Sequence, residues 1–331
     1  MNEAPKSHLP YIPLSRRSGP PGDTTITTFN LYNLFEVVQT PSGPSSPQAL
    51  ATKIAKLVMA LRYELLLPEI LVVQEVESEQ LLQKAGDAVN EAAGTAYQAL
   101  SPPCSDRRGI QVGLLWDEQR VELLHAHQLS SPAVFAAFGP QSPSPGREPL
   151  VGRFRLQDQE LTIIANHFKS DYTGDAGSSQ QERLLHASLT QRRAQARVVR
   201  DFANTLLQAD ADTLLVVAGD LNQTPPTLSK PIDAGNPLAI LHGGSHEIPL
   251  TNLLPSRPDP NNYTFIRDGR PIILDHILIS PALMKQFTGT DALHFNVAYP
   301  DVYQSDPSTP CRVSDHDPLE ARFIFNNDQK S

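Results

Sequence analysis

The sequence predicts an α/β chain, or an α+β chain in which two β-sheets pack together. Seven segments have the apolar, β-branched composition of strands, and segments between them carry apolar residues at helical spacing. Strands that alternate with helices are typical of layered folds whose helices cover a sheet. With 331 residues, the chain is long enough to bury a substantial core in one large domain or two.

The strand candidates recur along the whole chain. In order, they are residues 24–31, 69–76, 109–116, 160–168, 213–220, 272–280 and 320–325. The segment 49–66 predicts a helix that ends before Pro68, and the segment 191–207 predicts a second helix. Proline-rich stretches, after each of which a strand pattern resumes, indicate surface loops at 41–47, 130–149 and 225–237.

The composition is that of a soluble globular protein. Hydrophobic residues make up 40% and charged residues 19% of the chain, and the sequence has no apolar run long enough for a membrane span. The net charge of −9, from 36 acidic and 27 basic residues, disfavours a protein that wraps long stretches of duplex through many phosphate contacts. A nuclease remains compatible with this charge, because bound divalent cations change the local field.

The cysteines and the N-terminal residues give information about the cellular compartment of the protein. The only two cysteines, Cys104 and Cys311, exclude a disulfide scaffold and suit no zinc site, whereas one bridge between them and two free thiols both stay open. The first twenty residues lack the continuous apolar segment of a signal peptide. We therefore expect either a cytoplasmic protein or a trimmed mature form.

Polar side chains interrupt or close several predicted strands. Burying such groups without partners is costly, and loops at strand ends commonly carry function. A capped turn would explain any one case, but the repetition indicates a shared site. The residues concerned are Asn30, Gln74, Glu75, Asn166, His167, Lys169, Asp220, Asn222, Asp275, His276, Asp315, His316 and Asp317.

The residue types at these strand ends fit one chemistry. Carboxylate and amide oxygens suit a hard cation such as Mg²⁺, which bridges to phosphate oxygens. Histidines beside carboxylates suit proton transfer or the stabilisation of charge on a phosphoryl group. The sequence has neither a G-x-S-x-G elbow nor a Walker loop nor a dinucleotide fingerprint. The pattern therefore predicts metal-assisted hydrolysis of a phosphate ester.

A set of motifs occurs in order along the chain: FNLYNLF, LVVQEVE, DRRGIQVGLLW, NHFKSD, RRAQARVV, GDLN, YTFI with LDHILIS, and SDHDPLEARF. The set resembles the endonuclease/exonuclease/phosphatase (DNase I-like) superfamily and is similar to predicted extracellular nucleases of bacteria. The resemblance implies a four-layer sandwich of two packed mixed β-sheets flanked by helices. It implies a catalytic domain at 23–326, between a flexible Pro-, Arg- and Ser-rich tail at 1–22 and a C-terminal tail at 327–331.

The resemblance also implies a role for each matching residue. Glu75 corresponds to the principal metal ligand, and Asn30 and Asp315 lie near it, ligating directly or through water. Asp220 corresponds to the residue that orients or deprotonates the attacking water, or that holds a second cation. Asn222 corresponds to the residue that contacts the scissile phosphate and positions the nucleophile. The implied cofactor is Mg²⁺ or Mn²⁺, with Ca²⁺ as an alternative ion.

Two histidines also match family motifs. His316 corresponds to the histidine that stabilises the pentacovalent phosphorane, with Asp275 as its carboxylate partner. His167 corresponds to a second histidine of the deoxyribonuclease-like branch, which protonates the leaving oxygen. His276 follows Asp275 on a strand, where neighbouring side chains point to opposite faces, so we interpret His276 as structural.

Basic residues near the motifs are candidates for phosphate binding. Arg108 occupies the position of the branch arginine at the start of a strand, and Lys169 follows the histidine motif. Arg193, the third candidate, lies on the predicted helix 191–207, where most arginines are surface charges. Gln111 replaces an acidic residue that is usual in the branch, at a position to which we assign no catalytic role.

These observations predict a divalent-metal-dependent phosphodiesterase, a nuclease that hydrolyses DNA or RNA with low sequence specificity. The alternative is a hydrolase of a small phosphate ester, such as a lipid headgroup, a sugar phosphate or an inositol phosphate. The net charge of −9 and the 6% aromatic content favour that alternative. A binding protein that has lost catalysis is disfavoured, because Glu75, Asp220 and His316 are all present.

The same predictions cover partners and compartment. We expect nucleic acid as the substrate, no stable insertion into a membrane and no obligate protein partner. The family resemblance suggests a secreted or periplasmic protein.

Overall fold

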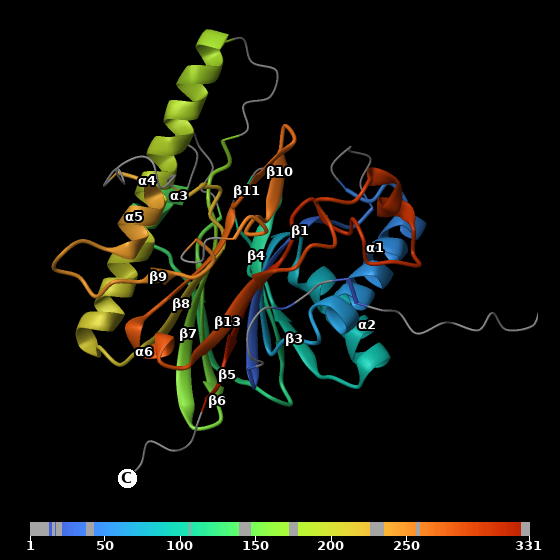
Figure 1. Cartoon of the computed structure of the whole chain (residues 1–331), viewed down its shortest axis with the longest axis horizontal. Helices are drawn as coiled ribbons and strands as arrows, with labels where there is room; N and C mark the ends of the chain where they lie inside the picture. Colours follow the sequence, from blue (N-terminus) through green and yellow to red (C-terminus); the bar gives the residue numbers. More distant parts are fainter. Residues whose placement is uncertain are drawn as a thin grey trace, which may run out of the picture.

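Two six-stranded sheets pack face to face at the centre of the protein (Figure 1). The first sheet contains, in spatial order, β13 (Phe287–Ala292), β14 (Leu319–Phe323), β1 (Thr24–Leu34), β2 (Ile70–Val76), β4 (Gln111–Asp117) and β3 (Tyr97–Leu100). The second contains β5 (Glu122–Gln128), β6 (Leu150–Leu156), β7 (Gln159–His167), β8 (Leu214–Asp220), β12 (Asp275–Ile279) and β9 (Thr251–Asn252). A separate two-stranded ribbon contains β10 (Phe265–Arg267) and β11 (Arg270–Ile272).

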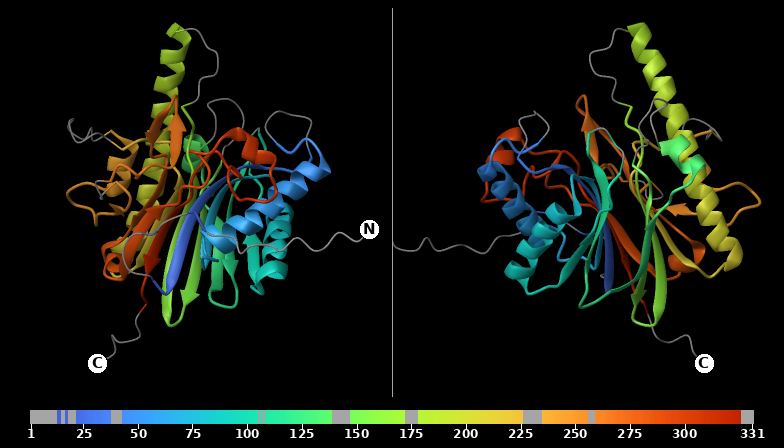
Figure 2. Two further views of the ribbon diagram at one scale, coloured as in Figure 1. Left: turned by 45° about the vertical axis from the view of Figure 1, so that its right-hand side comes forward. Right: turned by 180° about the vertical axis from the view of Figure 1, so that it is seen from behind.

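The helices cover the outer faces of both sheets and complete four layers (Figure 2). The first sheet is covered by α1 (Pro47–Met59), which continues as a π-helical turn (Ala60–Glu64), and by α2 (Glu79–Ala93). The second is covered by α3 (Pro132–Phe138), α4 (Ser178–Ala209) and α5 (Pro237–His242). Short helical turns occur at α6 (Pro281–Met284) and η2 (Asp301–Ser305). This architecture confirms the predicted fold.

The computed structural model describes residues 13–14, 17, 22–37, 43–104, 106, 108–138, 147–171, 178–225, 235–255 and 259–325. The predicted C-terminal tail at 327–331 and most of the predicted tail at 1–22 lie outside these residues. Within the latter, Arg17 forms an ion pair with buried Glu320 at 2.7 Å, and the backbone N–H of Leu14 donates to Glu64. None of the helices in the described part has both the length and the apolar character of a membrane span.

Apolar side chains fill the three spaces between the four layers. The central cluster packs Val72 of β2 against the second sheet, where Ile163 and Val216 are fully buried. Trp116 and Phe154 make an edge-to-face contact within the same cluster, with ring centroids 5.9 Å apart. The outer clusters pack α1 and α2 on the first sheet and α3, α4 and α5 on the second. Removal of this apolar surface from water holds the layers together.

Both sheets are mixed, and each has its one parallel pair near the centre. β1 pairs in parallel with β2, and β7 pairs in parallel with β8, whereas the other pairs in these two sheets are antiparallel. Because parallel strands end at the same sheet edge, each pair presents two strand ends together. The two pairs of ends meet where the sheets face one another, as the bond from Asn30 to Asp220 shows.

Several elements differ from the sequence prediction. The predicted helix 191–207 begins earlier, at Ser178. Residues 180–187 of this extension are exposed, so no buried apolar stripe marks them in the sequence. The predicted strand 272–280 is divided, since β11 ends at Ile272 and β12 starts at Asp275. The predicted loop 130–149 contains α3, and the amphipathic helix α2 was not predicted.

A buried lysine anchors the segment 301–311 to α1. Lys56 is 1% exposed, and its ammonium nitrogen lies 2.6 to 2.8 Å from four backbone carbonyl oxygens that share its three N–H donors, those of Tyr303, Asp306, Thr309 and Cys311. Burial lowers the pKa of Lys56 to about 8, against the attraction of Asp306. Charged donors make stronger hydrogen bonds than neutral ones, so this one side chain fixes the course of the segment.

We expect Lys56→Met to lower the free energy of unfolding by about 3 kcal/mol, because it leaves buried carbonyls without their charged donor. Urea unfolding followed by far-UV circular dichroism measures the change. Lys84→Met, on an exposed position of α2, is the matched control and should stay within about 0.5 kcal/mol of the parent. Equal stability of the two variants would show that the carbonyl contacts contribute nothing.

His276 lies on the face of β12 that points away from Asp275 and is fully buried. Its Nε2 lies 2.8 Å from the carbonyl of Gln223 and its Nδ1 lies 3.0 Å from Nδ2 of Asn252. A neutral ring satisfies both contacts, with Nε2–H donating and Nδ1 accepting. Burial lowers the pKa of His276 to about 4, against the opposing effects of the Gln223 carbonyl and Asp275. This is a structural histidine, as the alternation of the strand predicts.

Because the unfolded chain binds a proton at His276 near pH 6.5 and the native protein only near pH 4, this residue stabilises the fold above pH 6.5. The contribution is lost as the pH falls between these values, by about 2 kcal/mol from pH 7 to pH 5. His276→Gln should show that much less pH dependence than the parent. Urea unfolding of both proteins at the two pH values measures the difference, and parallel pH dependences would contradict it.

Candidate active site

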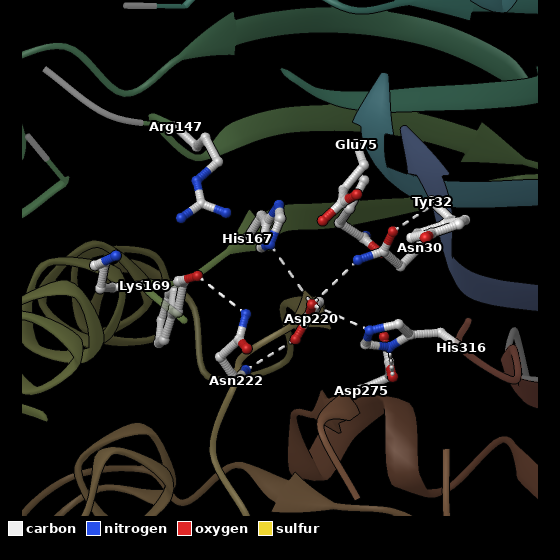
Figure 3. A network of polar contacts seen from close by, with 12 residues as sticks. Asn30, Tyr32, Glu75, Arg147, His167, Lys169, Asp220, Asn222, Asp275 and His316 are labelled. Atoms are coloured by element: carbon white, nitrogen blue, oxygen red, sulfur yellow. Dashed lines mark hydrogen bonds and ion pairs between the residues drawn. The ribbon is translucent and has the colours of Figure 1, made fainter. Parts of the chain in front are cut away.

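Three adjacent strands of the second sheet place His167, Asp220 and Asp275 in one row. In the strand register, His167 pairs with Asp220 and Asp220 pairs with Asp275. Residues paired across neighbouring strands project on the same face of a sheet, so all three side chains point toward the site (Figure 3).

The preceding row carries Gly219 at its centre, beside Asn166 and His276. Gly219 has φ of 142°, and a Cβ atom there would lie 1.9 Å from the carbonyl oxygen of Asn166. Only glycine fits, because any side chain would push β7 and β8 apart. The glycine therefore allows the His167 and Asp220 strands to end side by side.

The first sheet contributes Asn30 and Glu75 from the ends of β1 and β2. Asn30 Nδ2 donates to Asp220 Oδ2 at 3.2 Å, which links the two sheets directly. Glu75 Oε2 accepts a hydrogen bond from the backbone N–H of Asn33 at 3.1 Å. Glu75 has φ of 61°, a left-handed conformation that is strained in a residue with a side chain. The register with β4 shifts between Gln74 and Val76, and this irregularity within β2 lets the Glu75 carboxylate point toward the site (Figure 3).

His316 and Asp275 form a buried pair. His316 Nδ1 donates to Asp275 Oδ2 at 2.7 Å, and its Nε2 lies 3.9 Å from Asp220 Oδ2. Burial alone would lower the pKa of His316, but the carboxylates of Asp275, Asp220 and Asp315 together raise it well above its usual value. The ring is therefore held as a cation with Nε2–H directed into the site. Phe265 packs beside it, with ring centroids 4.8 Å apart.

The loop that carries Asp315 is tied to β1. Ser314 Oγ donates to the Asn30 carbonyl at 2.6 Å and accepts the backbone N–H of His316 at 3.0 Å. Burial, together with the charge of Glu75, raises the pKa of Asp315, whereas His316 lowers it. Asp315 and Glu75 thus lie close enough to repel one another.

Asp220 lies at the centre of the site. Its Oδ1 accepts the backbone N–H of Asn222 at 2.9 Å, and its Oδ2 lies 3.5 Å from His167 Nε2. Burial raises the pKa of Asp220 to about 7, against the lowering effect of His316. Asn222, with φ of 49°, donates from Nδ2 to the Phe168 carbonyl at 3.2 Å. The strained turn thus fixes both the carboxylate and the carboxamide.

His167 is the electrostatic opposite of His316. Burial, with the nearby cations Arg147 and Arg108, lowers the pKa of His167 well below its usual value, so its ring is neutral. Its buried Nδ1 has no hydrogen-bond partner among the described residues. The structure therefore places one charged and one neutral imidazole on opposite sides of Asp220.

Arg147 is a site residue that the sequence did not reveal. It lies in the segment between α3 and β6, is 9% exposed and points toward His167 (Figure 3). Its Nε lies 3.6 Å from Asp106 Oδ2, and Asp106 Oδ1 accepts the backbone N–H of Arg108 at 2.8 Å. Arg147 lies within the predicted surface loop 130–149. An arginine three residues before a buried strand is too weak a signal to identify it.

Of the three predicted phosphate-binding residues, two lie at the site and one does not. Arg108 lies 3.7 Å from Glu75 Oε2, and the ammonium of Lys169 makes no hydrogen bond or ion pair to a described residue. The structure does not bring Arg193 to the site, since its Nε donates to the Gly235 carbonyl at 2.6 Å. The adjacent Arg192 faces the site instead and donates to the Lys169 carbonyl at 3.0 Å, because neighbours on a helix point about 100° apart.

The donor set fits a hard divalent cation. Glu75, Asp315, Asn30 and Asp220 offer only oxygen ligands from side chains. Among the described residues, Asp220, Asp275 and His316 have ligand atoms within 4.8 Å of one another. In that group, however, the nitrogen of His316 nearest Asp275 is occupied by a hydrogen bond. Both cysteines are free thiols in this structure, and Cys104 donates to the Ile110 carbonyl.

Solved structures with the same fold span nearly the whole chain. Human Nocturnin catalytic domain with bound sulfate is 17% identical, with 94% of this chain and 97% of that chain covered and a TM-score of 0.59. Mannosyl-6-phosphatase of Bacteroides thetaiotaomicron is 15% identical, with coverages of 92% and 100% and a TM-score of 0.59. TDP2 of D. rerio, humanized by 14 mutations, is 17% identical, with coverages of 90% and 97% and a TM-score of 0.55. At these identities the likeness establishes the fold alone.

Sequence comparison gives the family. No curated protein sequence matches the chain. The model of the endonuclease/exonuclease/phosphatase family matches residues 25–306, which include Asn30, Glu75, His167, Asp220 and Asp275. Members of this family are phosphoester hydrolases and typically depend on divalent metal ions. The chain therefore belongs to the endonuclease/exonuclease/phosphatase family and is a phosphoester hydrolase.

Proposed function

We propose that the chain is a divalent-metal-dependent phosphodiesterase that cleaves DNA or RNA with low sequence specificity. The distribution of charge around Asp220 carries this proposal. The carboxylates of Glu75 and Asp315 lie on one side of the site and Arg147 lies beside His167, while Arg108 lies near both groups, 3.7 Å from Glu75 Oε2. The similarity to predicted extracellular nucleases of bacteria points to the same class.

The cations near His167 carry more positive charge than one phosphate group would balance. Arg147, Arg108 and Arg192 lie close enough to Lys169 to lower its pKa, in addition to the effect of its burial, while Asp106 raises it. These cations lie close together although the protein as a whole has a net charge of −9. Such a cluster is stabilised by a ligand with several negative charges, as a phosphodiester backbone provides.

The chain's oxygen donors would hold the metal ion. Glu75 and Asp315, with Asn30 beside them, form the proposed site for Mg²⁺ or Mn²⁺, and Ca²⁺ is a weaker candidate. When bound, the ion would neutralise charge on the phosphate oxygens. Lys53 is near both carboxylates. Its ammonium group donates to the carbonyls of Tyr32 and Val313, and its single positive charge is fewer than the two negative charges of Glu75 and Asp315.

The remaining roles follow from hydrogen bonding. Asp220, held by the backbone of Asn222, would orient the attacking water, and the Asn222 side chain would contact the scissile phosphate. His316 has its Nδ1 engaged by Asp275 and therefore directs Nε2–H toward the charge that develops on the phosphoryl group. His167, being neutral, would act on the leaving oxygen through a hydrogen bond, without donating from an imidazolium.

The alternative function is hydrolysis of a small phosphate ester. The similarity to a mannosyl-6-phosphatase supports it, whereas the similarity to D. rerio TDP2 complexed with single-strand DNA product supports a nuclease. The two likenesses are equally distant, at 15% and 16% identity. We favour the nuclease because several cations, Arg147, Arg108 and Arg192, lie near Lys169.

We expect the purified protein to cleave plasmid, single-stranded DNA or RNA with Mg²⁺ or Mn²⁺ and to be inactive with EDTA. Glu75→Ala and His316→Ala should each reduce the rate by about 100-fold or more, because each removes stabilisation of phosphoryl charge. Glu91→Ala and His125→Ala, at exposed positions, are the matched controls. Thermal melting verifies that each variant folds.

Two results would contradict the proposal. Full activity of folded Glu75→Ala and His316→Ala would overturn the assigned site. Turnover of sugar phosphates or inositol phosphates, with all nucleic acids left intact, would establish the small-ester alternative.

A further inference from the structure

A cavity of about 480 Å³ adjoins the reaction centre on its carboxylate side. Three segments line it: the last part of β1, the residues before α1 together with its first turns, and the part of the chain from η2 to Val313. The segment that contains η2, drawn in red, lies beside α1 in Figure 1, although the two are far apart in sequence. The volume falls within the range that is usual for sites of small organic groups. None of the roles proposed above uses this cavity.

The wall shared with the reaction centre is strained. Tyr32 and Asn33 line the cavity and have φ of 50° and 52°, two consecutive left-handed residues that are not glycine. Their backbone N–H groups contact Asn30 Oδ1 at 2.9 Å and Glu75 Oε2 at 3.1 Å. One strained turn therefore holds the proposed metal ligands on one side and lines the cavity on the other. Strain of this kind is retained where function requires the geometry.

The cations of the cavity are already bonded within the protein. Lys53 donates to the carbonyls of Tyr32 and Val313, at 2.9 and 3.1 Å, and Lys56 donates to four carbonyls. Arg312 is paired with Asp301 at 2.6 Å. A phosphate group would therefore find no uncommitted cation among these residues. This separates the cavity from the cationic side, where the ammonium of Lys169 is uncommitted.

The groups left for recognition are uncharged. The side chains of Gln48, Thr52 and Gln304 line the cavity and make no hydrogen bond to a described residue. They come from opposite walls, with Gln48 and Thr52 on α1 and Gln304 on η2. Carboxamides and hydroxyls both donate and accept hydrogen bonds, and the Tyr32 ring adds an aromatic surface. Such a lining suits a neutral group rich in hydroxyl and amide functions.

We propose that the cavity is a subsite for the nucleoside next to the scissile phosphate, on the side of the site that carries Glu75. This inference rests on the proposed nuclease function and adds the position of the sugar and base. The substrate would extend from the cavity, across Asp220, to the cations around Lys169. The uncharged sugar and base would occupy one end and the following backbone phosphate the other.

The test blocks the cavity without touching the reaction centre. Thr52→Phe fills it from α1, and Gln304→Trp fills it from the exposed η2, so that either variant suffices if the other fails to fold. Ala55→Phe adds the same bulk to an exposed position of α1 that does not line the cavity. The substrates are a short single-stranded DNA, thymidine p-nitrophenyl phosphate and bis-p-nitrophenyl phosphate, which lacks a nucleoside.

We expect both blocking variants to raise KM for the two nucleoside-containing substrates by about tenfold, with kcat near that of the parent. Ala55→Phe should behave as the parent on all three substrates. Hydrolysis of bis-p-nitrophenyl phosphate should be unchanged in every variant, because the cavity does not contact its phosphate.

The outcomes distinguish this inference from the proposed function. A parent protein that degrades nucleic acid, with blocking variants equal to it, would overturn the cavity assignment alone. An equal loss on bis-p-nitrophenyl phosphate would also overturn it, since the variants would then disturb the reaction centre. A parent protein that hydrolyses small esters but no nucleic acid would overturn the nuclease proposal and the nucleoside subsite together.

Discussion

The face-to-face packing of the two sheets is the constraint on which the site depends. Neither sheet holds a complete set of groups. Asn30 and Glu75 lie on β1 and β2 of the first sheet, whereas His167, Asp220 and Asp275 lie at strand termini of the second. The buried apolar cluster between the sheets fixes their separation. The hydrogen bond from Asn30 to Asp220 joins the two sheets at the edge of this cluster, where the polar site begins.

Burial then determines which groups of the site are charged and which are neutral. Removal from water would disfavour every ion in it, so each charged form requires a partner. Asp275 supplies that partner for His316, which stays protonated, whereas His167 has cations beside it and stays neutral. Two histidines with the same intrinsic chemistry thus take opposite states because of their neighbours. By the same argument, the carboxylates of the site favour a bound cation and its arginines and lysine favour a bound anion.

Buried lysines shape the edge of the site without acting in the reaction. Lys53 and Lys56, one turn apart on α1, donate to the Tyr32 carbonyl near the end of β1 and to carbonyls of the segment 301–313. Those loops carry Tyr32 and Asp315, and the space between them is the cavity. Carbonyl groups of irregular backbone need donors when they are buried, and a lysine can satisfy several of them at once. The helix therefore supports the loops with charge as well as packing.

The sequence by itself determined the fold class and the residues that meet at the site, because apolar periodicity and polar strand ends are local patterns. The family motifs added the pairing of His316 with Asp275. Only the tertiary structure showed that Arg147 lies at the site and that Arg192, not the predicted Arg193, faces it. The cavity beside Tyr32 also became visible only there. These features depend on which loops meet across the edge of the sandwich and on the direction of each helical side chain. That information arises only when distant segments pack together.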